Sequence, residues 1–189
     1  MEYKRKILLI LGVSGVGKSS VIREIQNKRT DFIRVAHYTT RPLRFGETEK
    51  IHVSEKEMDI FENSSDYCVI RTHYADKVFR YAICYSEILH IISSGKNYAV
   101  MDWAVSRMSF IEQSLVENDI FSVYLIPPSE NELQRRLSLD ERNNTGERLE
   151  KAKKEIFLFK KGSFTGKYSM SIICDSIHVV ANEILKNFY

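Results

Sequence analysis

The chain has 189 residues, of which 43% are hydrophobic and 28% are charged, as in globular domains that fold in water. Lys and Arg (28) nearly balance Asp and Glu (25), so the net charge of +3 gives no indication of nucleic-acid binding. Three scattered cysteines argue against a disulfide scaffold or a zinc site, and no apolar run approaches the roughly 18 residues of a membrane span. We therefore expect one cytoplasmic domain with no nucleic-acid or membrane partner.

The first informative stretch is an apolar run at residues 7–11 followed by GVSGVGKSS. The run lacks polar alternation and predicts a buried strand, and residues 19–27 have the apolar spacing of a helix. The sequence between them fits G-x-x-x-x-G-K-[ST], a phosphate-binding loop whose backbone N–H groups and helix N-terminus bind oxyanions. ATP is the expected ligand, with Lys18 at its phosphates and the Ser19 hydroxyl on Mg²⁺. The expected ATP-binding residues are Gly12, Ser14, Gly15, Val16, Gly17, Lys18, Ser19 and Ser20.

Further along the chain, strand-like and helix-like segments alternate. Residues 37–47 are expected to form a polar loop, and Ser54 with Glu57 has the spacing of a capping box that starts a helix. This alternation predicts an α/β fold, with a parallel sheet covered on both faces and ligands at the carboxyl ends of its strands. The predicted strands are 32–36, 67–72, 98–101, 121–126 and 171–174, and the later helices are 85–93, 105–116, 129–139, 147–159 and 177–188.

Charged residues follow several of these strands. Asp102 follows the strand at 98–101 and could lie near Mg²⁺ or a phosphoryl acceptor, or could cap the next helix. Arg41 and Arg44 lie in the loop TTRPLR, where guanidinium groups could hold a phosphate through paired hydrogen bonds. Arg136 and Arg148 flank a polar stretch that could act as a lid over the transferring phosphoryl group, or simply form a basic helix face.

These segments together resemble the guanylate kinase family. HYTTRPLRFGE is similar to the family's S-x-T-T-R-x-P-R-x-G-E, and YAVMD, PPSENELQRRL and RLEKAKKE match later family segments in order and spacing. The resemblance implies a P-loop NTPase three-layer sandwich with a central parallel sheet, a small acceptor-binding subdomain and a helical lid. It implies a single domain, 1–189. Within it, the core would be 1–37, 95–130 and 151–189, the acceptor-binding subdomain 38–94, and the lid 131–150.

The resemblance also implies an activity and a set of site residues. An ATP-dependent kinase of this family transfers the γ-phosphoryl group of Mg-ATP to a phosphorylated small acceptor, here a nucleoside monophosphate of the GMP or dGMP type. The only partner expected is that small molecule, although the sequence leaves a homodimer open. The implied catalytic residues are Lys18, Arg41, Arg136 and Arg148. The implied acceptor-binding residues are His37, Thr39, Arg41, Arg44, Glu47, Tyr81 and Asp102, and the implied metal-binding residues are Ser19 and, through water, Asp102.

The chain departs from the family where the guanine base would be read. The segment after Glu47 is shorter and lacks the family's D-Y pair, and the family's base-reading Glu falls near Arg71 and Thr72, neither of which is acidic. The sequence therefore does not predict strict GMP specificity. A sugar-phosphate kinase is one alternative, because TRPLRFGETEKIHVSEKEM resembles the ribose 1,5-bisphosphate phosphokinases. A non-catalytic guanylate kinase-like binding module is another, although the intact phosphate loop argues against it.

Overall fold

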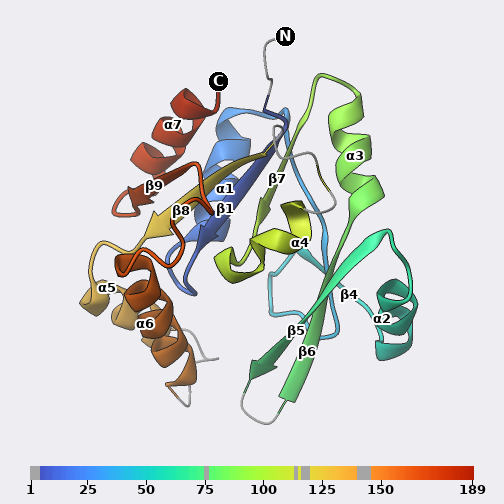
Figure 1. The fold of residues 1–189 in the computed structure, drawn as a ribbon, viewed down its shortest axis with the longest axis horizontal. Helices are drawn as coiled ribbons and strands as arrows, with labels where there is room; N and C mark the ends of the chain where they lie inside the picture. Colours follow the sequence, from blue (N-terminus) through green and yellow to red (C-terminus); the bar gives the residue numbers. More distant parts are fainter. Residues whose placement is uncertain (1–4, 75–76, 113–114, 116–119, 140–145) are drawn as a thin grey trace.

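A parallel five-stranded sheet forms the centre of the computed structural model, which describes residues 5–74, 77–112, 115, 120–139 and 146–189 (Figure 1). All its neighbouring strands pair in parallel. None of the helices in the described ranges is long and apolar enough to cross a membrane. The strand order is β2 (Phe32–Arg34), β7 (Tyr98–Asp102), β1 (Ile7–Gly12), β8 (Ile120–Ile126) and β9 (Met170–Ile173).

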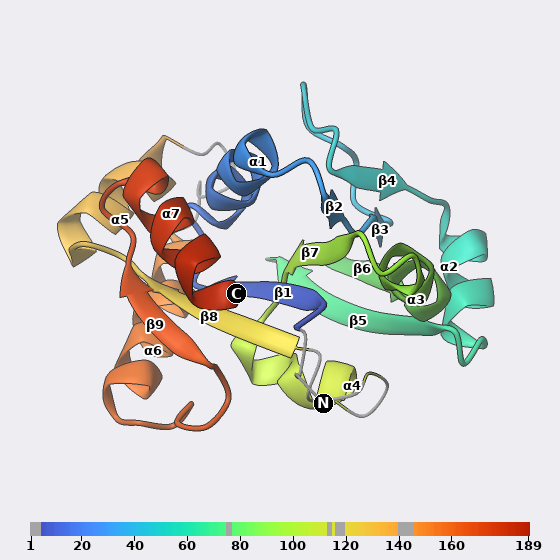
Figure 2. The ribbon, with the colours of Figure 1, turned by 90° about the horizontal axis from the view of Figure 1, so that it is seen from above.

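Helices cover both faces of this sheet, which confirms the predicted three-layer α/β fold (Figure 2). One face packs against α1 (Lys18–Lys28) and α7 (Ile177–Phe188), and the other against α3 (Tyr85–Ser93) and α4 (Met108–Glu112). Beyond the carboxyl end of β8, the chain continues into α5 (Glu130–Ser138) and, later, α6 (Glu147–Lys160).

β1 is buried along its whole length because its two sets of alternating side chains enter two different cores. Leu8 and Ile10 pack with α1 and α7, while Leu9 and Leu11 pack with α3 and α4. A strand with apolar neighbours on both faces needs a continuous apolar sequence, which is why the apolar run at residues 7–11 predicted this strand. The loop that follows β1 is thereby held in a fixed position at the carboxyl end of the sheet.

A second, smaller sheet was only partly predicted. Its order is β4 (Lys50–His52), β3 (His37–Thr39), β6 (Lys77–Cys84) and β5 (Tyr67–Tyr74), and the β5–β6 pair forms the long hairpin of Figure 1. The prediction of a loop at residues 37–47 was wrong at its start, where β3 forms, and neither β4 nor β6 was predicted. Strands of three residues are too short to show an alternating pattern, and they are defined here by their sheet partners.

The predicted helix at 105–116 also differs from the structure. The segment begins with a 3₁₀ turn, η1 (Val105–Arg107), and becomes α-helical only in α4. Most of the predicted C-terminal end lies outside the described residues. The predicted capping box is confirmed, because Ser54 and Glu57 exchange hydrogen bonds at the start of α2 (Glu55–Glu62).

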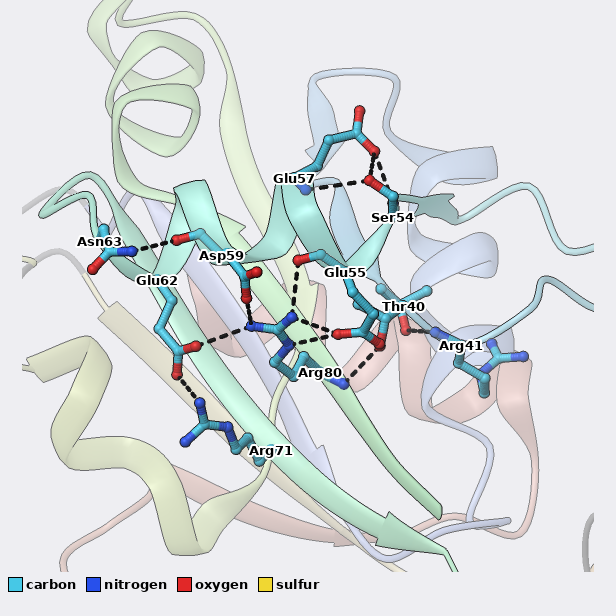
Figure 3. Close-up of polar contacts among 11 residues, drawn as sticks. Thr40, Arg41, Ser54, Glu55, Glu57, Asp59, Glu62, Asn63, Arg71 and Arg80 are labelled. Carbon is cyan, nitrogen blue, oxygen red and sulfur yellow. Dashed lines mark hydrogen bonds and ion pairs between the residues drawn. The ribbon is translucent and has the colours of Figure 1, made fainter.

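Arg80 joins α2 to the second sheet through a cluster of charges (Figure 3). Its guanidinium group donates to Glu55, to Asp59 (2.6 Å) and to Glu62 (3.0 Å), three carboxylates on one face of the helix. Its backbone N–H and C=O bond to Thr40, next to Arg41. Met58 and Phe61 of α2 also pack in the small apolar core of this sheet, so the charge cluster adds to an apolar attachment of the helix.

We expect Arg80→Met to lower the free energy of unfolding by about 1–3 kcal/mol, because three carboxylates on one helix face would lose their common partner. Arg71 is a matched control, since it lies opposite Arg80 in the β5–β6 register but is 59% exposed and, among the described residues, forms an ion pair with Glu62 alone. Arg71→Met should cost less than about 0.5 kcal/mol. Urea denaturation measures both, and equal costs would show that the cluster does not hold α2.

Candidate active site

A cavity of about 600 Å³ opens at the carboxyl ends of β1 and β7. Gly12 ends β1 and Asp102 ends β7, and both line the cavity because their strands are parallel neighbours in the sheet. The phosphate-loop residues form one side. The other side includes one face of the second sheet, with Ile70, Thr72 and Tyr81. The cavity therefore combines a predicted nucleotide site with a surface on which a second molecule could bind.

The loop between β1 and α1 is tightly packed against its surroundings. Gly12 has a φ of 130°, and a Cβ there would lie 2.6 Å from the Leu125 carbonyl oxygen of β8. Gly15 has a φ of 82°, and its Cβ would meet the Leu137 side chain of α5 at 2.9 Å. Larger residues would displace this backbone, which is the reason that the sequence needs glycine at both positions.

Lys18 occupies the inside of this loop. Its Nζ donates to the carbonyl oxygens of Gly12 (2.6 Å) and Val13 (3.0 Å). Burial lowers the pKa of Lys18, while Asp102 and Glu155 oppose that shift. α1 begins at Lys18 on the cavity wall, so the positive end of its helix dipole lies at the cavity, and its first turn, KSS, carries no acid to offset it. These features together favour binding of an anion such as phosphate.

Seven of the eight predicted ATP-binding residues line the cavity; the exception is Val16, whose side chain is buried in the core. Of the two predicted lid arginines, Arg148 is 4% exposed, lines the cavity and donates to Ser14 Oγ at 3.0 Å. Arg136 instead donates to the Val16 carbonyl at 3.0 Å and to Glu132, behind the loop. Arg148 therefore contacts the phosphate loop from the cavity side and Arg136 from the other.

The two arginines of the predicted acceptor loop differ in position. Arg41 is 8% exposed and makes two hydrogen bonds to the Glu47 carboxylate, at 2.8 and 2.6 Å, and one to the Pro42 carbonyl. It and Thr39 lie outside the cavity wall, whereas Arg44, Glu47, His37 and Tyr81 line it. Arg41 therefore shapes the loop, and Arg44 is the arginine that faces the cavity. The predicted role of Arg41 in catalysis remains a prediction.

Asp102 forms an ion pair with Arg34 at 2.9 Å. The alternative that it caps the following helix is wrong, because the residue that precedes η1 is Ala104. Burial alone would raise the pKa of Asp102, but His37, Lys50, Lys18 and Arg34 hold it well below its ordinary range. Asp102 is therefore a charged carboxylate at the edge of the predicted phosphate site.

His37 is buried beside Asp102 and stacks on Trp103. Burial lowers the pKa of His37 to about 4, with Lys50 and Arg34 adding to this shift and Asp102 opposing it. The ring is therefore neutral at pH 7. It can position an acceptor by packing or hydrogen bonding, but it brings no charge.

Several residues at the cavity were not predicted. Lys151 and Glu155 were detectable, because they lie three and seven residues after Arg148 and so share its face of α6. Lys151 Nζ also donates to the His73 carbonyl at 2.7 Å, linking α6 to β5. Ile70 and Thr72 lie on the predicted strand 67–72, and Thr72 is near the position of the family's base-reading Glu, so this part of the wall also had a signal in the sequence. The others had no such signal; they include Glu49, Lys50, Trp103, Ser106 and Arg107.

The sequence matches the guanylate kinase family over residues 4–185, nearly the whole chain. This chain belongs to the guanylate kinase family. Members of that family are phosphotransferases that act on nucleoside monophosphates, so the predicted class of enzyme is confirmed. The match extends over both the phosphate loop and the second sheet.

Individual guanylate kinases are similar along most of their length. The guanylate kinase of Sulfurimonas denitrificans is 30% identical, with 97% of this chain and 87% of that protein covered. That of Thermobifida fusca is 27% identical, with 97% and 91% covered. The crystal structure of guanylate kinase from Anaplasma phagocytophilum superimposes with a TM-score of 0.70 at 17% identity, covering 98% of this chain and 84% of that one, and supports the fold.

We expect His37 to lower the folding stability of this kinase at acidic pH. A His with a pKa of about 4 when folded and about 6.5 when unfolded binds more protons in the unfolded state, so stability falls as pH decreases through this window. His37→Gln should remove up to about 1 kcal/mol per pH unit of that slope between pH 6.5 and 4. Asp102, with its lowered pKa, stays charged throughout. Urea denaturation between pH 6.5 and 4 tests this prediction, with His90→Gln at an exposed position as the control. If the free energy of unfolding of His37→Gln depended on pH as steeply as that of the wild type, His37 would not be the source of the acid sensitivity.

Proposed function

We propose that this protein is a cytoplasmic kinase that transfers the γ-phosphoryl group of Mg-ATP to GMP or dGMP. The observation that carries the proposal is the single cavity shared by the phosphate loop and one face of the second sheet. Phosphoryl transfer requires two phosphorylated molecules to meet end to end, and a shared cavity permits this. Membership of the guanylate kinase family supports GMP as the acceptor.

The donor half of the site consists of the loop and the start of α1. The loop amides and Lys18 would hold the β- and γ-phosphates, and the Ser19 hydroxyl would bind Mg²⁺. Among the described residues no group of three or more His, Cys, Asp or Glu side chains could hold a metal by itself. Mg²⁺ would therefore be bound together with the nucleotide phosphates, which supply further oxygen ligands when present. We assign Asp102 a role through water at most, because Arg34 already pairs with it.

The acceptor half consists of the second sheet and the loop after β3, within the proposed subdomain 38–94. Arg44 and Tyr81 line the cavity there and would hold the acceptor phosphate. Arg148, which contacts Ser14 from α6, would stabilise charge on the phosphoryl group during transfer. The proposed lid is 131–150, of which residues 140–145 lie outside the described structure, and it would exclude water. Catalysis would thus depend on positioning and electrostatics, with no covalent enzyme intermediate.

We expect Lys18→Ala to lower kcat by about 10²-fold or more, since a single donor to developing charge has effects of that order. The fold should persist, because within the described residues the Lys18 ammonium group donates only to two carbonyl oxygens of its own loop. ADP formation from Mg-ATP should be measured with GMP, dGMP, AMP and ribose 1,5-bisphosphate. GMP or dGMP should give the highest kcat/KM. Turnover of ribose 1,5-bisphosphate alone would overturn the nucleotide assignment, and full activity of Lys18→Ala would overturn the donor site.

We expect Arg44→Met to raise the KM for the acceptor by about tenfold or more, with the KM for ATP unchanged. Arg44 is suited to this test because its side chain lines the cavity and is 41% exposed. Arg23→Met on the exposed face of α1 is the matched control and should alter neither constant. An unchanged acceptor KM in Arg44→Met would remove this residue from the phosphate site.

A further inference from the structure

One wall of the cavity, formed by β5 and the turn after β7, presents hydrogen-bond donors. Side chains alternate along β5, so Arg71 points to α2 and pairs with Glu62, while Ile70 and Thr72 face the cavity. Ser106 and Arg107 of η1 line the same cavity. This wall, which we call the donor wall, therefore carries two hydroxyl groups and a guanidinium group.

Arg107 is fixed against β5 at both its backbone and its side chain. The indole N–H of Trp103 donates to the Arg107 carbonyl at 2.9 Å, and Arg107 Nη2 donates to the Arg71 carbonyl at 2.6 Å. Arg107 Nη1 is buried and has no hydrogen-bond partner among the described residues. Burial also lowers the pKa of Arg107. A ligand that brought a hydrogen-bond acceptor to this guanidinium group would therefore gain affinity.

The carboxylates of the described cavity wall are engaged or located elsewhere. Glu47 pairs with Arg41, Asp102 with Arg34, and Glu155 accepts a hydrogen bond from Tyr124. Glu49 precedes β4, which is at the opposite edge of the second sheet from β5. The donor wall thus recognises acceptor atoms, and within the described residues it has no carboxylate with which to bind N–H groups.

We propose that Arg107 and Thr72 determine base specificity by binding the O6 and N7 edge of a 6-oxopurine. The inference rests on the proposed function, since it assumes a nucleoside monophosphate acceptor. One N–H of Arg107 and the hydroxyl of Thr72 are two donors that match the acceptors O6 and N7 of guanine, whereas adenine places an amino donor where O6 would be. GMP and IMP present the same O6 and N7 atoms and differ only in the 2-amino group. The enzyme should therefore accept both and reject AMP.

The test is kcat/KM for GMP, IMP and AMP with Mg-ATP. In the wild type, GMP and IMP should agree within about tenfold, and AMP should be about 10- to 100-fold poorer. Arg107→Met should lower kcat/KM for GMP and IMP by a similar factor, mainly through KM, and leave AMP unchanged. Arg107→Lys should recover part of the loss. Thr72→Val, which is nearly isosteric, should lower the GMP-to-AMP ratio and provides a second test should Arg107→Met not fold.

Arg71→Met is the matched control, because its side chain faces α2, and it should leave the GMP-to-AMP ratio unchanged. A wild-type preference for GMP over IMP greater than about 100-fold would overturn the inference, since the 2-amino edge would then be read. An unchanged GMP-to-AMP ratio in both Arg107→Met and Thr72→Val would also overturn it. These failures leave the proposed function intact. Turnover of ribose 1,5-bisphosphate but of none of the three nucleotides would instead refute the proposed function, and the inference with it.

Discussion

The site depends on how closely the loop between β1 and α1 approaches β8 and α5. β1 is buried on both faces and ends at Gly12, where only a residue without Cβ fits beside the Leu125 carbonyl. Arg136 and Arg148 hold the loop from two sides, through the Val16 carbonyl and Ser14 Oγ. The loop amides are thus fixed by the core before any ligand binds, which is the condition under which backbone dipoles stabilise a phosphate most effectively.

The second sheet is organised by the alternation of one hairpin. On β5 and β6, Arg71 and Arg80 point to the carboxylates of α2, while Ile70, Thr72 and Tyr81 point to the cavity. Charges that attach α2 are therefore kept on the opposite face from the residues that line the cavity. This separation would allow the cavity-facing side chains to change without disturbing the attachment of the helix.

The sequence was sufficient for those features that are local. Spaced glycines predict the phosphate loop, a continuous apolar run predicts β1, and apolar residues at helical spacing predict α7. The predicted bounds of these elements agree closely with the structure. β3 and β4 depend on pairing with distant strands, so their three residues carried no signal. The spacing of Arg41 and Arg44 also could not show which one faces the cavity, because the position of Glu47 decides this. Arg107 reaches the cavity from a 3₁₀ turn that the sequence suggested would be α-helix.

The contact of Lys151 with β5 has a consequence for the energetics of binding. α6 touches the phosphate loop through Arg148 and the hairpin through Lys151, residues nearly one turn apart on one helix face. A displacement of α6 therefore changes both halves of the cavity at once. If both substrates favour the same placement of the helix, the first to bind leaves α6 in the placement that the second binds best. The two affinities are then coupled, and reciprocity requires that each substrate strengthens binding of the other by the same factor.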